Sequence, residues 1–203
     1  MILLITISMA MCQTAWGEGL IEDYGADEEV NFEACAEFVC DPLRIRRYTM
    51  ALKQIREYYT KYNRPGMPLS LEAKMMVVSN YLRVEFKEWD FVGFYYLNKE
   101  KSLDQLEIGP YATIIKTPMP FYRKGQGIVG KVWETEDMIM INNIAKEAGY
   151  TTYDGRARAE LGLPCFDLDG NLFAVLKVYS ELPNIFEQTD QICLEEIINY
   201  LDY

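Results

Sequence analysis

Histidine is absent from this sequence, and the remaining chemically active side chains are of few kinds. The commonest metal ligand is therefore missing, together with the usual base that activates a serine or cysteine nucleophile. The cysteines lack the paired spacing of a zinc site and form no evident disulfide framework. We expect buried or free thiols and neither a metal nor another cofactor. The five cysteines are Cys12, Cys35, Cys40, Cys165 and Cys193.

Asp154 and Glu160 are a second set of groups with chemical potential. They lie a few residues apart, across an expected helix end and strand start, so both carboxylates are able to face one cavity. Without a histidine or a metal beside them, they suit ligand recognition better than acid–base catalysis. The tyrosines at 111, 122, 150 and 153 line either a pocket or the core, and we retain Tyr111 and Tyr153 as candidates for ligand contact.

The glycine-rich segment GQGIVG at residues 125–130 is superficially similar to a phosphate-binding loop. It lacks the spacing of dinucleotide and nucleoside triphosphate loops, and it does not follow the strand of a βαβ unit. We therefore expect a tight turn rather than a phosphate site.

Charge is distributed unevenly along the chain. The formal net charge is −11, and residues 1–41 carry many carboxylates but no lysine or arginine. Nucleic acids and anionic membranes are recognised by clustered basic residues, which this sequence does not show. No apolar run is long enough for an ordinary transmembrane helix. We expect neither nucleic acid nor membrane as a partner.

The first 17 residues are apolar and include small residues, as in a signal peptide, but the usual basic residues at the start are missing. We expect a cytoplasmic protein, with export through this segment as the alternative. Residues 1–41 are interpreted as an apolar N-terminus followed by an acidic leader, loosely ordered around Gly19 and Gly25.

The elements that must position the candidate residues follow from periodicity and turn signals. Asp41 and Pro42 start a helix that extends to about Tyr62, and Ser70 caps a second helix that ends near Phe86. Alternating or apolar segments predict strands, and Asp169-Gly170 predicts a hairpin turn. The expected strands are 90–97, 106–115 (one or two strands), 138–141, 160–168 and 171–180, and helices are expected after residue 130, through Val132 and Trp133, and at 189–201. This order predicts an α+β fold with helices against an antiparallel sheet.

Several segments, in this order, resemble the GAF domain and, within that superfamily, the free methionine-(R)-sulfoxide reductases. The matching segments are FVGFYYL (91–97), IGPY (108–111), GQGIVG (125–130), MIMINNIAKEAGY (138–150), RAELGLP (158–164), AVLKVYS (174–180) and Phe186. The resemblance implies one GAF-like domain over residues 42–203, including the two N-terminal helices, that binds a small molecule.

The resemblance also indicates what this chain lacks. The reductases use reactive and resolving cysteines, as thiol-based sulfoxide reduction requires. Two of the family's cysteine positions are occupied here by Val129 and Tyr153, and residues 113–117 contain no cysteine. Cys165 follows Pro164 at a position expected to pack in the core. We therefore do not expect sulfoxide reductase activity.

The resemblance assigns a ligand pocket with aromatic walls and a few carboxylates. Phe91 and Tyr95 fall where the family places a tryptophan and a tyrosine on the first strand, and Glu160 matches a glutamate that faces the ligand ammonium. Lys177 and Tyr179 replace two aspartates, so a ligand more negative than methionine sulfoxide is expected. The alternative is that Lys177 extends outward from an edge strand. The candidate ligand-binding residues are Phe91, Tyr95, Tyr111, Tyr153, Asp154, Glu160, Lys177 and Tyr179.

Three functions remain open, because a fold does not fix a function. The first is a non-catalytic sensor domain for an anion or an amino-acid-like metabolite. The second is a thiol enzyme with a displaced cysteine, Cys165, assisted by Cys35 or Cys40. The third is a scaffold with a vestigial pocket that forms a homodimer through its N-terminal helices.

Overall fold

The computed structural model describes residues 41–98, 104–114 and 118–201, so most of the acidic leader lies outside the described part. A six-stranded antiparallel sheet with strand order β3-β2-β1-β6-β5-β4 forms its centre. The central position of β1, β6 and β5 decides which side chains are enclosed. The strands are β1 (Phe91–Leu97), β2 (Leu106–Thr113), β3 (Phe121–Tyr122), β4 (Ile139–Ile141), β5 (Ala159–Phe166) and β6 (Leu172–Ser180).

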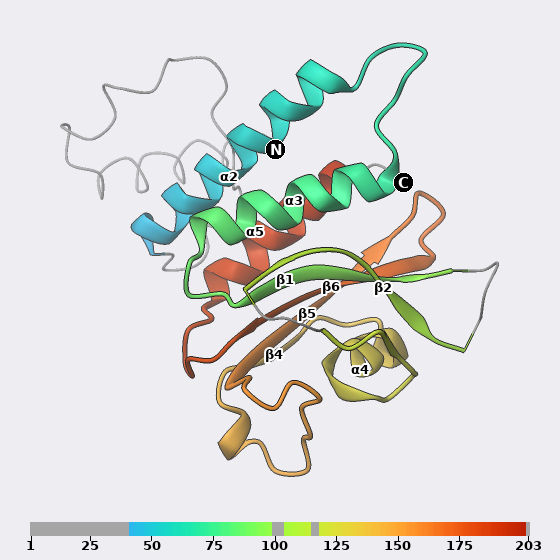
Figure 1. The fold of residues 1–203 in the computed structure, drawn as a ribbon. Helices are drawn as coiled ribbons and strands as arrows, with labels where there is room; N and C mark the ends of the chain where they lie inside the picture. Colours follow the sequence, from blue (N-terminus) through green and yellow to red (C-terminus); the bar gives the residue numbers. More distant parts are fainter. Residues whose placement is uncertain (1–40, 99–103, 115–117, 202–203) are drawn as a thin grey trace, which may run out of the picture.

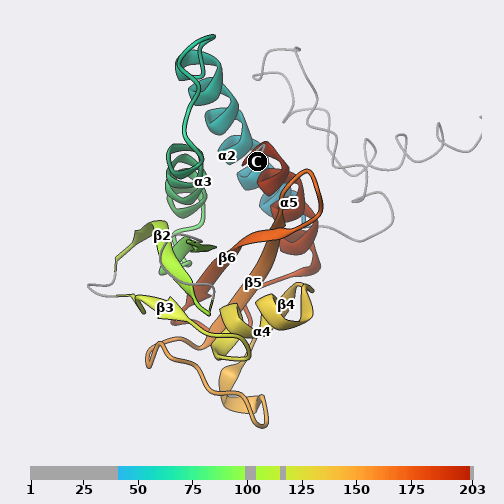
Figure 2. The ribbon, with the colours of Figure 1, turned by 90° about the vertical axis from the view of Figure 1, so that its right-hand side faces the viewer.

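Helices cover the two faces of this sheet unequally (Figures 1 and 2). Helices α2 (Pro42–Tyr62), α3 (Leu71–Glu85) and α5 (Gln188–Ile198) lie on one side, which we call the three-helix face. Helix α4 (Gly127–Thr135) packs on the opposite side, the α4 face, against β5 and β6. Short 3-10 turns occupy Ile144–Lys146 and Asn199–Leu201. This is the predicted α+β architecture.

The first two helices begin where their capping residues predict. The Asp41 side chain accepts a hydrogen bond from the Leu43 amide at 3.0 Å, and the Ser70 hydroxyl accepts one from the Ala73 amide at 3.2 Å. Each cap satisfies an amide that has no partner within its helix. None of the helices in the described ranges is both long and apolar enough to span a membrane.

Alternation along the central strands separates two hydrophobic cores. In β6, Leu176 and Val178 belong to the core on the three-helix face, whereas Val175 and Tyr179 belong to the core on the α4 face. Tyr48, Trp89 and other large side chains fill the first core. The sheet thus separates the buried side chains of its central strands into two hydrophobic cores.

Two local predictions differ from the structure. Residues 106–113 form the single strand β2, and the next strand, β3, lies in the proline-containing segment where no strand was predicted. Two residues are too short for a recognisable alternation. The GQGIVG segment is a turn as expected, because the Gly125 amide donates to the Gly130 carbonyl at 2.9 Å, but it also contains the first residues of α4.

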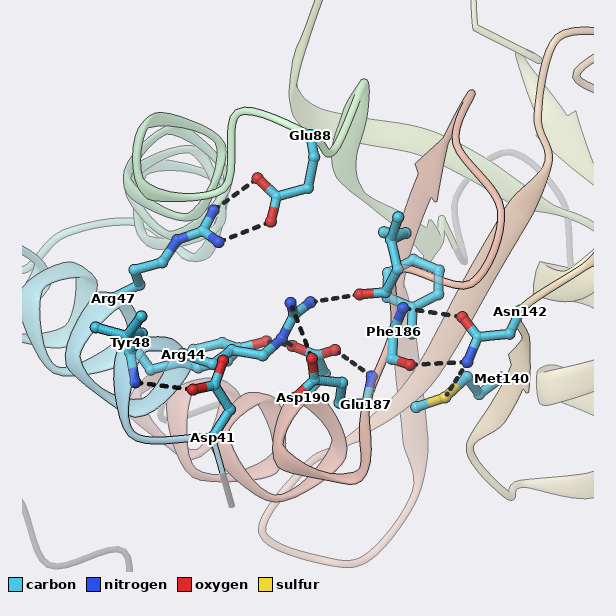
Figure 3. A network of polar contacts seen from close by, with 12 residues as sticks. Asp41, Arg44, Arg47, Tyr48, Glu88, Met140, Asn142, Phe186, Glu187 and Asp190 are labelled. Atoms are coloured by element: carbon cyan, nitrogen blue, oxygen red, sulfur yellow. Dashed lines mark hydrogen bonds and ion pairs between the residues drawn. The ribbon is translucent and has the colours of Figure 1, made fainter. Parts of the chain in front are cut away.

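A buried polar network joins α2 to the start of α5 (Figure 3). Asp190 accepts hydrogen bonds from Arg44 Nε and from the Tyr48 hydroxyl, both at 2.6 Å, and from the Glu187 amide at 2.7 Å. Burial raises the pKa of the Asp190 carboxyl, and the Arg44 guanidinium opposes that shift. The network fixes the N-terminal end of α5 against α2, since all its buried polar atoms need partners.

The same network extends to the connection between β6 and α5. Arg44 Nη2 donates to the Ile185 carbonyl at 2.8 Å. The side chain of Asn142 donates to the Phe186 carbonyl at 2.7 Å and accepts from the Phe186 amide at 2.8 Å (Figure 3). Asn142 is the first residue of the segment 142–158 between β4 and β5, which we call the β4–β5 loop. The loop is therefore anchored to the layer that holds α2.

Candidate ligand-binding site

Residues predicted to bind a ligand converge on the α4 face. Phe91 pairs with Tyr179 across β1 and β6, and Tyr179 pairs with Glu160 across β6 and β5. Directly paired residues point to the same side of a sheet, so these three side chains form one row. Side chains two or four residues apart in a strand point to the same face. Tyr95, four residues after Phe91 in β1, and Lys177, two residues before Tyr179 in β6, therefore lie on the same face as this row. The central strands thus bring together five of the predicted residues.

Lys177 lies at the centre of the site. The residue is 1% exposed, because β6 is flanked by β1 and β5. The ammonium forms an ion pair with Asp154, lies 3.3 Å from Glu160 Oε1 and donates to the Tyr122 hydroxyl at 2.9 Å. The alternative in which Lys177 extends outward from an edge strand is therefore wrong.

Glu160 is equally enclosed and is held by the β4–β5 loop. Its carboxylate accepts hydrogen bonds from the Tyr150 hydroxyl and, at 3.0 Å, from the Thr152 hydroxyl. Burial lowers the pKa of Lys177, but Glu160 and Asp154 outweigh burial, so the pKa is raised. The lysine is consequently a charged group with two anionic partners.

Aromatic rings surround the Lys177 ammonium. The ring centroids of Tyr122, Tyr179 and Phe91 lie 5.1, 5.6 and 6.0 Å from Nζ. Ring faces attract cations, most strongly where water is excluded. Tyr95 lies beside this group, edge-on to Tyr122 at 4.9 Å, and its hydroxyl donates to the Met119 carbonyl at 2.9 Å.

Tyr111 and Tyr153 lie at the outer edge of the site. Tyr111 is 37% exposed and stacks on Phe91 with centroids 5.8 Å apart. Tyr153 is 44% exposed and meets Tyr122 edge-on at 6.0 Å. Both side chains are thus accessible from the surface while each contacts an enclosed ring of the site.

Sequence reasoning missed part of the site. Tyr122 and Tyr150 were not retained as candidates, and Thr152 was not considered, yet all three contact the buried charges. Tyr122 belongs to a two-residue strand, and the other two belong to a loop without periodicity. For Tyr150 and Thr152, their closeness in sequence to the predicted carboxylates Asp154 and Glu160 could have indicated a place in the site.

The charges of the site do not cancel completely. One lysine and two carboxylates, Asp154 and Glu160, leave a net charge of 1 − 2 = −1. Burial is the largest cause that raises the pKa of Tyr95, Tyr122, Tyr150 and Tyr179, so the phenols stay neutral. The predicted preference for a negative ligand does not follow from Lys177 alone, because its charge is already paired.

The described cysteines lie on the other side of the sheet. Cys165, in β5, and Cys193, in α5, belong to the core on the three-helix face. Burial raises the pKa of Cys165 to about 12, which disfavours the reactive thiolate. Cys165 is thus a core residue, as predicted, whereas Cys35 and Cys40 lie outside the described residues. In the described ranges, no group of three histidine, cysteine or acidic residues is arranged to hold a metal ion.

A separate surface cavity of about 580 Å³ lies where β5 approaches α5. Its walls combine apolar side chains such as Leu163 and Phe166 with the acidic Glu136 and Glu195. None of the predicted ligand-binding residues lines it. This cavity is therefore distinct from the site around Lys177.

Comparison with known proteins supports the fold. No protein-family model matches the chain. It is 28% identical to GAF domain-containing protein A of Dictyostelium discoideum over 130 residues. The aligned region covers 64% of this chain and 78% of that protein. The structure of a free methionine-R-sulfoxide reductase from Neisseria meningitidis, in complex with its substrate, has a TM-score of 0.67 at 22% identity, covering 81% of this chain and 90% of that one.

A protein described as a GAF sensor from Burkholderia vietnamiensis gives a TM-score of 0.66 at 20% identity, covering 78% of this chain and 92% of that chain. The chain therefore has the GAF domain fold, which confirms the predicted resemblance. Free methionine-R-sulfoxide reductases are among its close structural neighbours.

Proposed function

We propose that this chain is a non-catalytic GAF-type domain that binds a small anion or amino-acid-like metabolite between the α4 face and the β4–β5 loop. The observation that carries this proposal is the convergence of aromatic rings and charged side chains on one side of the sheet. A few oriented polar groups among aromatic walls are typical of small-molecule sites. Occupancy would be passed to a partner protein or across a homodimer.

Binding is favoured over catalysis by the chemistry of the site. The sequence has no histidine, and Cys165 and Cys193 face away from Lys177. The lysine and its carboxylates are engaged with one another, which suits recognition better than proton transfer.

One observation favours a second candidate, a scaffold whose pocket no longer binds a ligand. Phe91, Tyr95, Glu160, Lys177 and Tyr179 are each at most 2% exposed, and the charges are paired internally. In that case the helices would mediate assembly while the polar cluster stabilises the fold.

A thermal-shift screen over amino acids, small carboxylates, inorganic anions and cyclic nucleotides distinguishes the two candidates. A ligand at 100 times its dissociation constant is expected to stabilise the fold by about 2.7 kcal/mol. Tyr153→Ala and Tyr111→Ala, at exposed positions of the site, are expected to weaken this shift. The matched control is Leu168→Ala, which is 93% exposed in the distant β5–β6 hairpin.

If no compound stabilises the protein, the scaffold is the better account. Turnover of free methionine-(R)-sulfoxide with a thiol reductant would overturn the non-catalytic assignment.

A further inference from the structure

We propose that the Asp154 carboxylate occupies the position of a ligand carboxylate, so that a ligand binds by displacing Asp154 from Lys177. This inference rests on the proposed function and deepens it, because it names a small organic carboxylate as the ligand class. The argument depends on which of the three paired charges is able to leave the site.

Lys177 cannot leave without disturbing the sheet. It lies in β6 between two neighbouring strands, and its side chain is enclosed by aromatic rings. Glu160 is fixed in β5 and also accepts hydrogen bonds from Tyr150 and Thr152. Removing either group would leave a buried charge or buried hydroxyls without partners.

Asp154 is the partner that is able to move. It belongs to the β4–β5 loop, its side chain is 10% exposed, and its neighbours Tyr153 and Gly155 are both exposed. Its backbone is held separately, since its amide donates to the Thr152 hydroxyl and its carbonyl accepts from the Ala157 amide. Rotation of the side chain toward solvent therefore breaks the ion pair without unfolding the loop.

Charge balance selects an exchange of one carboxylate for another. An anion that enters while Asp154 stays would make the enclosed net charge more negative, from −1 to −2. A cation would have to compete with Lys177 for the two carboxylates. A ligand carboxylate that replaces Asp154 keeps the charge at −1 and leaves Lys177 with two anionic partners. The displaced Asp154 is then hydrated at the surface.

The surroundings of Asp154 also suit the organic part of such a ligand. The Tyr122 hydroxyl lies 3.5 Å from Asp154 Oδ2, and the Tyr122 and Tyr153 rings meet edge-on nearby. A ligand that places its carboxylate on Lys177 would thus rest its carbon atoms against the Tyr122 and Tyr153 rings.

Chemical rescue tests the exchange, with acetate and propionate as probes. We expect Asp154→Ala to lower the melting temperature of the protein and sodium acetate to restore it in a saturable manner. The apparent Kd of acetate should be at least tenfold lower for this variant than for the unmodified protein. Equal concentrations of sodium chloride and methylammonium chloride should not restore it. Asp169→Ala, at an exposed hairpin position, is the matched control and should show no acetate-specific response.

Two further variants make the result decisive. The double variant Asp154→Ala with Lys177→Met should lose the response to acetate, because the cation that receives it is gone. If Asp154→Ala does not fold, Asp154→Asn keeps the side-chain shape without the charge, and it should bind acetate more tightly than the unmodified protein. The same acetate response with and without Lys177, or none in either Asp154 variant, overturns the proposal.

The outcomes also separate this inference from the proposed function. If the screen finds a metabolite whose affinity is unchanged by Asp154→Ala, the binding function stands and the exchange is wrong. If acetate rescues Asp154→Ala but no metabolite stabilises the unmodified protein, Lys177 accepts a carboxylate only when Asp154 is absent, so both the exchange and the binding function are wrong and the domain is better described as a scaffold.

Discussion

At the scale of single residues, the molecule depends on a lysine where a hydrophobic residue would be expected. Lys177 occupies a central strand position that is 1% exposed. Removing a charge from water is costly, and the attraction of Asp154 and Glu160 compensates for it only while all three groups are present. We call Lys177, Asp154 and Glu160 the triad, because the two carboxylates stabilise the buried ammonium together.

Lys177→Met should destabilise the protein strongly. Methionine is close to lysine in length but leaves the buried Glu160 carboxylate without its cation, so the free energy of unfolding should fall by about 3–5 kcal/mol. Urea denaturation followed by circular dichroism measures this loss. Lys146→Met, at an exposed loop position, should change stability by at most about 0.5 kcal/mol. Equal stability of the two variants would show that the triad contributes nothing.

Stability should fall at alkaline pH. Burial raises the pKa of Tyr95, Tyr122, Tyr150 and Tyr179 above the ordinary value of 10.0, and the carboxylates raise that of Lys177 above 10.5. A raised folded-state pKa gives stability that is complete below the unfolded-state value and lost as pH rises past it. The free energy of unfolding from these groups should be flat below about pH 10 and decrease above it.

This pH prediction has a spectroscopic check. Near-ultraviolet absorbance of tyrosinate should rise at higher pH in the folded protein than in urea, because the buried phenols keep their protons. Coincident titration curves in the two states would contradict the assignment of these tyrosines to an enclosed site.

At the scale of elements, the path of the chain around α4 determines how Tyr122 reaches the site. A Cβ atom at Gly130 would lie 2.0 Å from the Arg123 carbonyl oxygen, so the turn and the helix approach too closely for any side chain. Tyr122 immediately precedes Arg123 and contacts Lys177. Gly130 thus allows α4 to lie against the residue that follows β3. This close approach places the Tyr122 hydroxyl within hydrogen-bonding distance of the Lys177 ammonium.

Gly130→Ala should therefore destabilise the fold by about 1–3 kcal/mol, because backbone atoms must shift to accept the methyl group. Urea denaturation measures the effect. Gly155→Ala is the matched control, since a Cβ there meets nothing within 4 Å. A Gly130→Ala variant as stable as Gly155→Ala would contradict the close approach.

Sequence reasoning succeeded where the signal is local and periodic. The caps at Asp41 and Ser70, and the alternation that puts Phe91 and Tyr95 on one face, follow from neighbouring residues. The pairing of Lys177 with Asp154 could not be predicted in this way, because it depends on how the β4–β5 loop returns over the sheet. The charge of Lys177 was therefore predicted to be available for a ligand, whereas the structure shows it paired.

At the scale of the whole molecule, the sheet separates thiol groups from the candidate site. Cys165 and Cys193 pack among the side chains of the three-helix face, and Lys177 and its partners lie on the α4 face. Neither described thiol is able to reach the site while the sheet is intact.

Cys165 and Cys193 should accordingly resist alkylation in the folded protein. Brief treatment with iodoacetamide, followed by peptide mass spectrometry, should leave both unlabelled, whereas the same treatment in urea should label both. The raised pKa of Cys165 adds to the protection that burial provides. Rapid labelling of Cys165 without denaturant would show that this core opens readily.

The bonds around Asn142 give the β4–β5 loop a mechanical connection to α2. The Asn142 side chain forms two hydrogen bonds with the backbone of Phe186. The adjacent Ile185 carbonyl accepts a hydrogen bond from Arg44, in the first turn of α2. The adjacent residues Ile185 and Phe186 thus connect the β4–β5 loop, which contacts Lys177, to helix α2 on the opposite face of the sheet. Any displacement of the loop at Asn142 must therefore either break these bonds or move the backbone at Ile185 and Phe186, which Arg44 holds against α2.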